Sequence, residues 1–119
     1  WHKEADVYLR DLKDGQVKAI PEVNSVEAES YHAWSSNGRW LVFASRRDDG
    51  LYSRPYIAYI DENGKGHKPF VVPQHTPDFY LHSMKSYNVP EFIKEPVELD
   101  RRMIIETAKE GQALKVAAQ

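Results

Sequence analysis

Four carboxylates occur as two adjacent pairs that could supply a general acid and a general base. Asp48 and Asp49 follow one apolar run, and Asp61 and Glu62 follow another. Two carboxyl groups that flank a glycosidic bond carry out glycoside hydrolysis, and their separation sets the stereochemical outcome. Each of these four residues, however, sits in or beside a predicted turn, where Asp is favoured because its side chain hydrogen-bonds nearby backbone amides. We therefore prefer a turn role for both pairs.

A second group with possible chemistry consists of His75, Asp78 and His82. Imidazole and carboxylate groups are common ligands of zinc and related ions. Their spacing fits no established metal motif, and Pro77 is expected to prevent a helix from aligning them. We therefore predict surface or packing roles for these side chains, and neither a metal nor another cofactor.

The sequence contains no motif for a catalytic nucleophile. There is no G-x-S-x-G elbow, the strand-turn-helix element that exposes a serine nucleophile. There is no cysteine either, which excludes disulfides, thiolate metal sites and cysteine nucleophiles. We predict no catalytic residue and no enzymatic activity.

The best candidate for binding is a polar loop in which basic, acidic and aromatic side chains are mixed. Such mixtures occur on ligand and glycan surfaces, and loops held by a rigid scaffold often carry function. The candidate binding residues are Arg46, Arg47, Asp48, Asp49, Tyr52 and Arg54.

Length and charge limit the classes of protein and of partner. The 119 residues suffice for one modest domain, and 41% of them are hydrophobic. The net charge is -2 with scattered Lys and Arg, which argues against nucleic acid as a partner. No apolar run approaches the roughly 18 residues of a membrane span. The chain begins without Met or a signal peptide, so we expect it to be part of a longer protein.

Turn residues divide the first part of the chain into strands. Residues 5–20 should form a hairpin around Asp14 and Gly15, since Asp-Gly between two alternating runs is a strong hairpin signal. Pro21 ends this hairpin, and the polar residues 22–30 read as a connection. The sequence therefore predicts two strands before the next strand begins at Tyr31.

Residues 31–72 should form four antiparallel strands joined by tight turns. The strands are predicted at 31–34, 40–44, 55–61 and 68–72, with Asn37 and Gly38 able to take positive φ in the first turn. Residues 40–44 (WLVFA) are apolar on both faces, so this strand should be covered on both sides.

The C-terminal third differs in composition. Residues 73–97 contain four prolines and many aromatics, which predicts an extended, docked segment without strand or helix, here called the latch. Residues 98–119 form a helix or tail, in which Asp100 caps a helix with Met103, Ile104 and Ala108 on its apolar side and Gly111 at its end. RMIIET could instead be a strand. The aromatic side chains expected to cover the sheet are Phe79, Tyr80, Tyr87 and Phe92.

An internal repeat is the most informative pattern. ADVYLRDLKDGQVKAIP and RPYIAYIDENGKGHKPFVVP both read as apolar strand, acidic residue, turn with Gly, basic residue, short apolar strand and Pro. Four-stranded propeller blades repeat at roughly 40–45 residues, which fits the length of segment 31–72. The sequence predicts one full blade at 31–72 and half of a preceding blade at 5–20.

The stretch WSSNGRWLVFASRRDDG resembles the repeat of TolB-like β-propellers, which reads Trp, Ser, Pro, Asp, Gly, a basic residue, an apolar run, Ser, Arg or Asp residues and Gly. This chain departs from the pattern at Ser36 and Asn37, which keep turn chemistry. Residues 69–92 are similar to the C-terminal end of such propellers from Bacteroidetes. The matching residues are Trp34, Ser35, Gly38, Arg39, Leu41, Val42, Phe43, Ala44, Ser45, Arg46, Asp48, Asp49 and Gly50.

The resemblance implies that residues 1–97 are the C-terminal part of a propeller and that the chain is a non-catalytic binding or scaffolding module. It also implies a periplasmic or outer-membrane location. Its partner would be a protein or a glycan. One alternative is a fragment of a propeller-type carbohydrate-active enzyme or glycan-binding protein. Another is a self-contained β domain, favoured if residues 1–30 pack across residues 40–44 and not alongside them.

An incomplete propeller should expose a face that the next blade would cover. The face of residues 40–44 would then lack a partner within the chain, and unpaired edges and bare apolar faces promote association. The latch and helix could fold back over this face. We expect self-association of the chain instead, because the prolines of the latch hinder a flush apolar surface.

Overall fold

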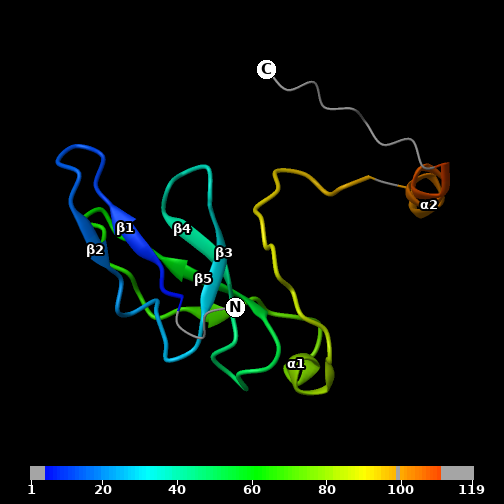
Figure 1. Ribbon diagram of the computed structural model, residues 1–119, viewed down its shortest axis with the longest axis horizontal. Coiled ribbons are helices and arrows are strands. Elements are labelled where there is room, and N and C mark those ends of the chain that lie inside the picture. The colour runs from blue at the N-terminus through cyan, green and yellow to red at the C-terminus, as the bar shows by residue number, and fades with distance from the viewer. Residues whose placement is uncertain (1–4, 99, 111–119) are drawn as a thin grey trace.

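The computed structural model describes residues 5–98 and 100–110, and it confirms a mainly β fold with two antiparallel sheets (Figure 1). The smaller sheet is the hairpin of β1 (Tyr8–Arg10) and β2 (Val17–Ala19). The larger sheet has the order β3-β4-β5-β6. Its strands are β3 (Glu29–Trp34), β4 (Trp40–Ser45), β5 (Arg54–Tyr59) and β6 (Phe70–Val71).

The larger sheet is the antiparallel meander that the turn spacing predicted. β3 begins at Glu29, two residues before the predicted start, and β6 is shorter than expected. In the β3–β4 turn Gly38 alone takes a positive φ, +64°, while Asn37 accepts a hydrogen bond from the backbone N–H of Arg39 at 3.1 Å. The polar side chain therefore closes the turn, and the glycine supplies the left-handed residue.

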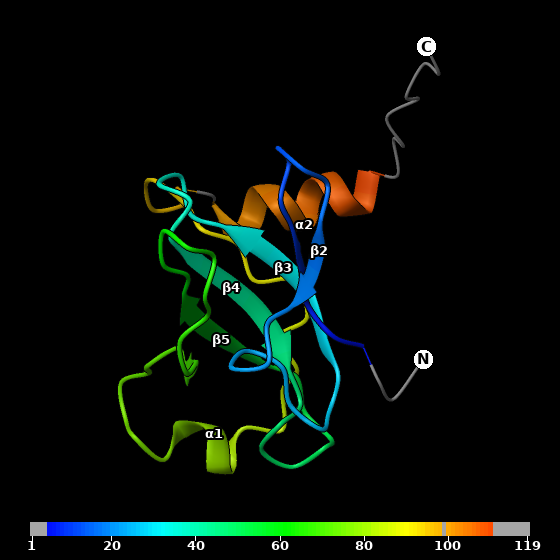
Figure 2. The ribbon, with the colours of Figure 1, turned by 90° about the vertical axis from the view of Figure 1, so that its left-hand side faces the viewer.

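The β1–β2 hairpin packs across one face of the larger sheet (Figure 2). Segment 5–23 contributes three side chains to a single buried core, and β4, β5 and the residue after β5 contribute the rest. This is the packing expected of a self-contained β domain, and neighbouring propeller blades also meet face to face. The described strands form no closed propeller. The core consists of Val7, Ile20, Val23, Leu41, Phe43, Tyr56, Ala58 and Ile60.

The opposite face of β4 is also covered at its centre. Val42 and Ala44 are 4% and 1% exposed, so the strand is buried on both sides as predicted, and the expectation of a bare face is wrong for these two residues. Trp40, on the same face, is half-buried, with its ring centroid 5.2 Å from that of Tyr59. Tyr59, like Trp40, is only partly buried, so these rings near the strand end remain in contact with solvent.

The latch contains a helix, which corrects the prediction of a wholly extended segment. α1 (Phe79–His82) is a single turn that begins two residues after Pro77, since proline is tolerated just before a helix but not within it. Tyr80 is buried, and its hydroxyl donates to the backbone carbonyl of Val72 at 3.0 Å. Farther along, the N–H of Tyr87 donates to the carbonyl of Ser53 at 2.8 Å, so the latch docks on the start of β5.

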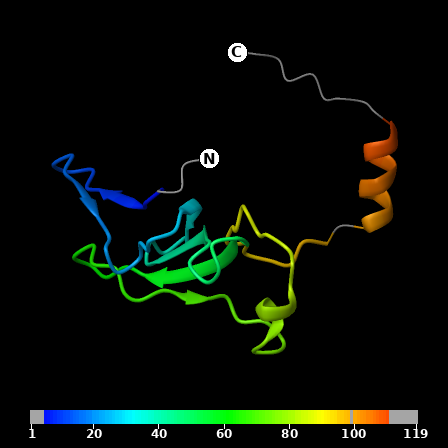
Figure 3. The same cartoon turned by 60° about the horizontal axis from the view of Figure 1, so that its bottom comes forward.

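A second helix, α2 (Arg101–Glu110), decides the C-terminal alternative in favour of helix over strand. The carboxylate of Asp100 accepts a hydrogen bond from the N–H of Arg102 at 2.9 Å, as predicted for a capping residue. The predicted end at Gly111 lies outside the described residues. α2 lies apart from both sheets, with Met103 and Ile104 exposed (Figure 3). Neither described helix is long and apolar enough to cross a membrane.

Candidate functional site

The predicted binding residues lie together on the loop between β4 and β5 and on the first residue of β5. Arg54 organises this loop from a nearly buried position. Its Nη2 lies 2.6 Å from Asp49 Oδ2, and its Nε lies 3.3 Å from Asp48 Oδ2 but without hydrogen-bond geometry. Its Nη1 donates to the backbone carbonyl of Tyr80. One guanidinium therefore joins the loop to the latch.

Asp49 holds the loop as a turn residue. Its Oδ1 accepts hydrogen bonds from the backbone N–H groups of Leu51 (2.8 Å) and Tyr52 (2.9 Å). The Tyr52 amide, then the Arg54 side chain and the Leu51 amide, lower the pKa of Asp49 to about 2. The carboxylate is thus ionised at neutral pH and is committed to the loop.

Asp48 is tied to β5 as well. The hydroxyl of Tyr56 donates to Asp48 Oδ1, and the pKa of this tyrosine is raised, chiefly by burial and then by the bond to the carboxylate. Asp48 keeps 42% of its side chain exposed. It is the more accessible carboxylate of the pair, yet both of its oxygens already face partners.

The sequence analysis placed Arg47 on a binding surface, but its side chain points into the protein. Its Nη2 lies 3.0 Å from Glu29 Oε1 and donates to the carbonyl of Val23 at 2.6 Å. Its guanidinium also stacks 4.6 Å from the centre of the Tyr56 ring. The Glu29 side chain is completely buried and accepts a hydrogen bond from the Ser45 hydroxyl. Arg47 and Glu29 form a buried structural ion pair, whose acidic partner the sequence analysis did not identify.

The two carboxylate pairs sit at opposite ends of the sheet. Asp48 and Asp49 follow β4, whereas Asp61 and Glu62 form the turn after β5. Asp61 Oδ1 accepts from the backbone N–H of Asn63 and of Lys65, each at 2.9 Å, and its pKa is lowered, chiefly by the bond from Lys65. The structure therefore brings these four carboxylates together only within each pair. Asp49 and Asp61 have the turn role that the sequence favoured, whereas Asp48 bonds Tyr56 and Glu62 pairs with Arg39.

The histidine group is partly assembled. Asp78 and His82 are drawn together by α1, with 3.5 Å between Oδ2 and Nε2, so the expectation that Pro77 keeps a helix from aligning them is wrong for this pair. Both side chains are largely exposed, and His75 is exposed in the segment before the helix. Within residues 5–98 and 100–110, no three His, Asp or Glu side chains are grouped closely enough to hold a metal ion.

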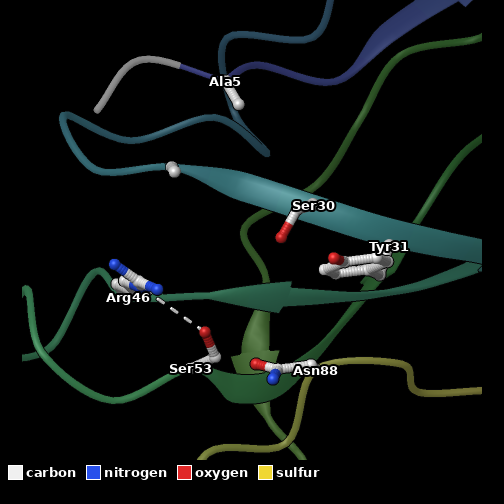
Figure 4. A pocket seen from close by; sticks show the side chains of 7 residues that line it. Ala5, Ser30, Tyr31, Arg46, Ser53 and Asn88 are labelled. Atoms are coloured by element: carbon white, nitrogen blue, oxygen red, sulfur yellow. Dashed lines mark hydrogen bonds between the residues drawn. The ribbon is translucent and has the colours of Figure 1, made fainter. Parts of the chain in front are cut away.

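A cavity of about 220 Å³ lies beside this loop, where β3, the β4–β5 loop and the latch meet (Figure 4). Of the predicted binding residues, Arg46 lines it, and its Nε donates to the Ser53 hydroxyl at 3.4 Å. Sequence reasoning missed the other polar residues here, because they come from three segments that only the fold brings together. The lining residues are Ala5, Ala28, Ser30, Tyr31, Arg46, Ser53 and Asn88.

Known proteins provide no functional assignment for this arrangement. No protein-family model, no curated protein and no solved structure matches the chain. Function has to be inferred from the residues and contacts of the chain itself.

Proposed function

We propose that this chain is part of a repeat-built β scaffold of the TolB-like propeller type, which binds a partner and catalyses no reaction. The observation that carries the proposal is the stacking of two equivalent hairpins. The first is β1–β2 and the second is β5–β6, and they correspond to the two halves of the sequence repeat.

The two hairpins are closed by similar turns, although the first is one residue longer, with Gly15 four residues after Asp11 and Gly64 three residues after Asp61. Asp11 Oδ1 accepts from the N–H of Lys13 at 2.8 Å, and Asp61 Oδ1 accepts from the N–H of the residue two positions on at 2.9 Å. In each turn a glycine N–H donates to the Asp carbonyl at 3.0 Å, and the glycine has a positive φ, +73° for Gly15 and +70° for Gly64. Recurrence of side-chain bond, backbone bond and dihedral angle is what a structural repeat requires.

The first hairpin also lies against the turn of the second. Lys18 Nζ donates to the carbonyl of Asn63 at 3.0 Å, so β2 contacts the turn of the second hairpin. Below this contact, Ile20 and Ile60 share the buried core. Units that bury their apolar faces on the preceding and following unit form solenoids and propellers, in which each unit contacts mainly its neighbours. The packing therefore supports a scaffold role.

The arrangement of charge supports binding over catalysis. Arg54 engages Asp48 and Asp49, and Arg47 engages Glu29, so these carboxylates stabilise the fold. A loop held this firmly presents a preformed surface to a partner. A location in the bacterial envelope belongs to the same proposal, since it depends on the propeller resemblance.

The proposal is tested by mapping binding and turnover on one sample. Amide chemical shifts of the isotope-labelled chain are recorded while a library of small polar compounds and peptides is added. We expect binders to shift amides of the β4–β5 loop and of the latch. Binders that cluster at the opposite end, around Asp61 and Asn63, would contradict the assignment of the surface.

The non-catalytic part of the proposal has its own assay. Chromogenic esters and glycosides are incubated with the chain, and we expect no hydrolysis above the buffer rate. Turnover that persists through purification and disappears in Asp48→Ala or Asp49→Ala would show that the loop is an active site. Glu62→Ala is the matched control, because it removes a carboxylate at the other end of the sheet.

A further inference from the structure

We propose that the cavity beside Arg46, called here the β3 pocket, binds a small carboxylate that also bears hydroxyl groups, such as a sugar acid. The inference rests on the proposed binding function and specifies its ligand class. The pocket is built by a backbone irregularity in β3, by a pinned latch and by the guanidinium of Arg46.

The first wall of the pocket is an irregularity in β3. Ser30 pairs with Ala44 and Ala33 pairs with Val42, so two residues of β3 lie opposite the single residue Phe43. This is a β-bulge, and its residue Tyr31 has a φ of +50°. Successive residues of a regular strand point to opposite faces. The bulge instead lets both Ser30 and Tyr31 line the same pocket (Figure 4).

The bulge is costly for this residue type, which suggests a use for it. A bulky side chain rarely adopts the left-handed region, and only Gly, Asn and Asp do so readily. Tyr31 is nevertheless held there with 51% of its surface exposed, so burial of the ring does not account for the conformation. Strained backbone of this kind clusters at binding sites, where it re-aims a side chain.

The opposite wall is pinned by two hydrogen bonds. The N–H of Tyr87 donates to the carbonyl of Ser53 at 2.8 Å, and the N–H of Ser53 donates to the hydroxyl of Ser86 at 3.3 Å. These bonds join the residue before β5 to the latch, and Asn88, the residue after Tyr87, lines the pocket. The wall opposite the bulge is therefore preformed.

The lining chemistry selects the ligand. Arg46 is the one residue of the seven with a full charge, and none of the seven is Asp or Glu. A guanidinium binds a carboxylate with matched geometry, and among the described residues that line the pocket no carboxylate would repel the ligand. Hydroxyl and carboxamide groups both donate and accept, which suits ligand hydroxyls, and the Tyr31 ring adds an apolar surface.

The test compares three probes that share parts of this chemistry. Sodium glucuronate, glucose and sodium acetate are titrated separately into the labelled chain while amide shifts of Ser30, Tyr31, Ser53 and Asn88 are followed. We expect saturable shifts at these amides with glucuronate, at a concentration at least roughly tenfold lower than with glucose or acetate, because only glucuronate engages both the charge and the hydroxyl partners.

Variants assign the effect to the pocket. Arg46→Met should weaken glucuronate binding by about tenfold or more, and Asn88→Ala should weaken it by a smaller factor. Arg10→Met is the matched control, since Arg10 is an exposed residue of the β1–β2 hairpin at the other end of the sheet, and it should bind glucuronate as the unchanged chain does. Dispersed amide spectra of each variant confirm that it folds.

Several results would overturn the inference. If glucose bound as tightly as glucuronate, the carboxylate would have no role in recognition. If acetate bound as tightly as glucuronate, the hydroxyl groups would have none. No shift at the four amides, or equal weakening by Arg10→Met, would show that the pocket does not take this ligand. If other compounds still bind the β4–β5 loop, the proposed binding function stands while the ligand class fails. Hydrolysis of glycosides would instead overturn the proposed function.

Discussion

Replacement of Gly66 by Ala tests whether the β1–β2 hairpin packs across the larger sheet. Gly66 is buried beside the end of β5, bridged to Ile60. A Cβ at this position would lie 2.3 Å from Ile20 Cγ2 and 2.9 Å from Val23 Cγ2. Ile20 is 2% exposed and Val23 is fully buried, so neither side chain has open space into which it could move.

The expected change follows from two opposing effects. Forcing an extra methyl into a packed core costs about 1–3 kcal/mol. Loss of glycine's freedom in the unfolded chain stabilises the folded state by about 0.4–1 kcal/mol, because Gly66 does not need a left-handed φ. We therefore expect Gly66→Ala to lower the free energy of unfolding by about 1–2 kcal/mol. If Ile20 and Val23 did not contact Gly66, the same substitution would raise the free energy of unfolding. The sign of the change therefore shows whether the contact is present.

The free energy of unfolding is measured by urea titration with tryptophan fluorescence, and an unchanged m value shows that the folded and unfolded states keep their compactness. In an Ile20→Ala background the cost of Gly66→Ala should shrink, since the clashing methyl is gone. Gly38→Ala is the control, because its Cβ would meet nothing within 4 Å and its cost comes from the φ of +64° alone. A Gly66→Ala variant at least as stable as the unchanged chain would refute the packing.

Three further changes probe the loop and the bulge. Tyr31→Gly should be more stable than Tyr31→Ala by about 1 kcal/mol in the same urea assay. Both variants lose the ring, and only Gly readily accepts a φ of +50°. Equal stabilities of the two variants would argue against the bulge. Arg47→Met should lower the free energy of unfolding by about 3 kcal/mol, because it leaves the buried Glu29 carboxylate without its cation. Adding Glu29→Gln to the same chain should recover part of that loss. An Arg47→Met variant as stable as the unchanged chain would exclude the buried pair. Asp49→Asn should be less stable than the unchanged chain at neutral pH, and the difference should shrink as the pH falls below about 4 and disappear only below about 2. The folded pKa of Asp49 is about 2 and its ordinary value is 3.8, so the unfolded state takes up the proton first on acidification. A difference as large at pH 2 as at neutral pH would disprove this origin.

Local features of this chain could be predicted from the sequence because neighbouring residues determine them. The Asp-Gly and Asn-Gly pairs fixed the turns at Gly15, Gly38 and Gly64, and the apolar run before Ser45 fixed β4 as a strand buried on both faces. Asp100 marked the start of α2 for the same reason, since a capping carboxylate acts on the amide two residues away. The antiparallel order of the larger sheet then followed from the short connections.

The candidate site depended on the tertiary structure. Arg46 and Arg47 are adjacent and of one residue type, yet Arg46 borders a pocket and Arg47 pairs with a buried glutamate. Sequence cannot separate them, because the partner Glu29 lies on another strand and its burial depends on how the hairpin covers the sheet. The left-handed φ of Tyr31 also has no signature in its residue type, since the offset between β3 and β4 produces it. Turns and strands are set by contacts between residues close in sequence, whereas this site is set by side chains far apart in sequence that meet only after the chain has folded.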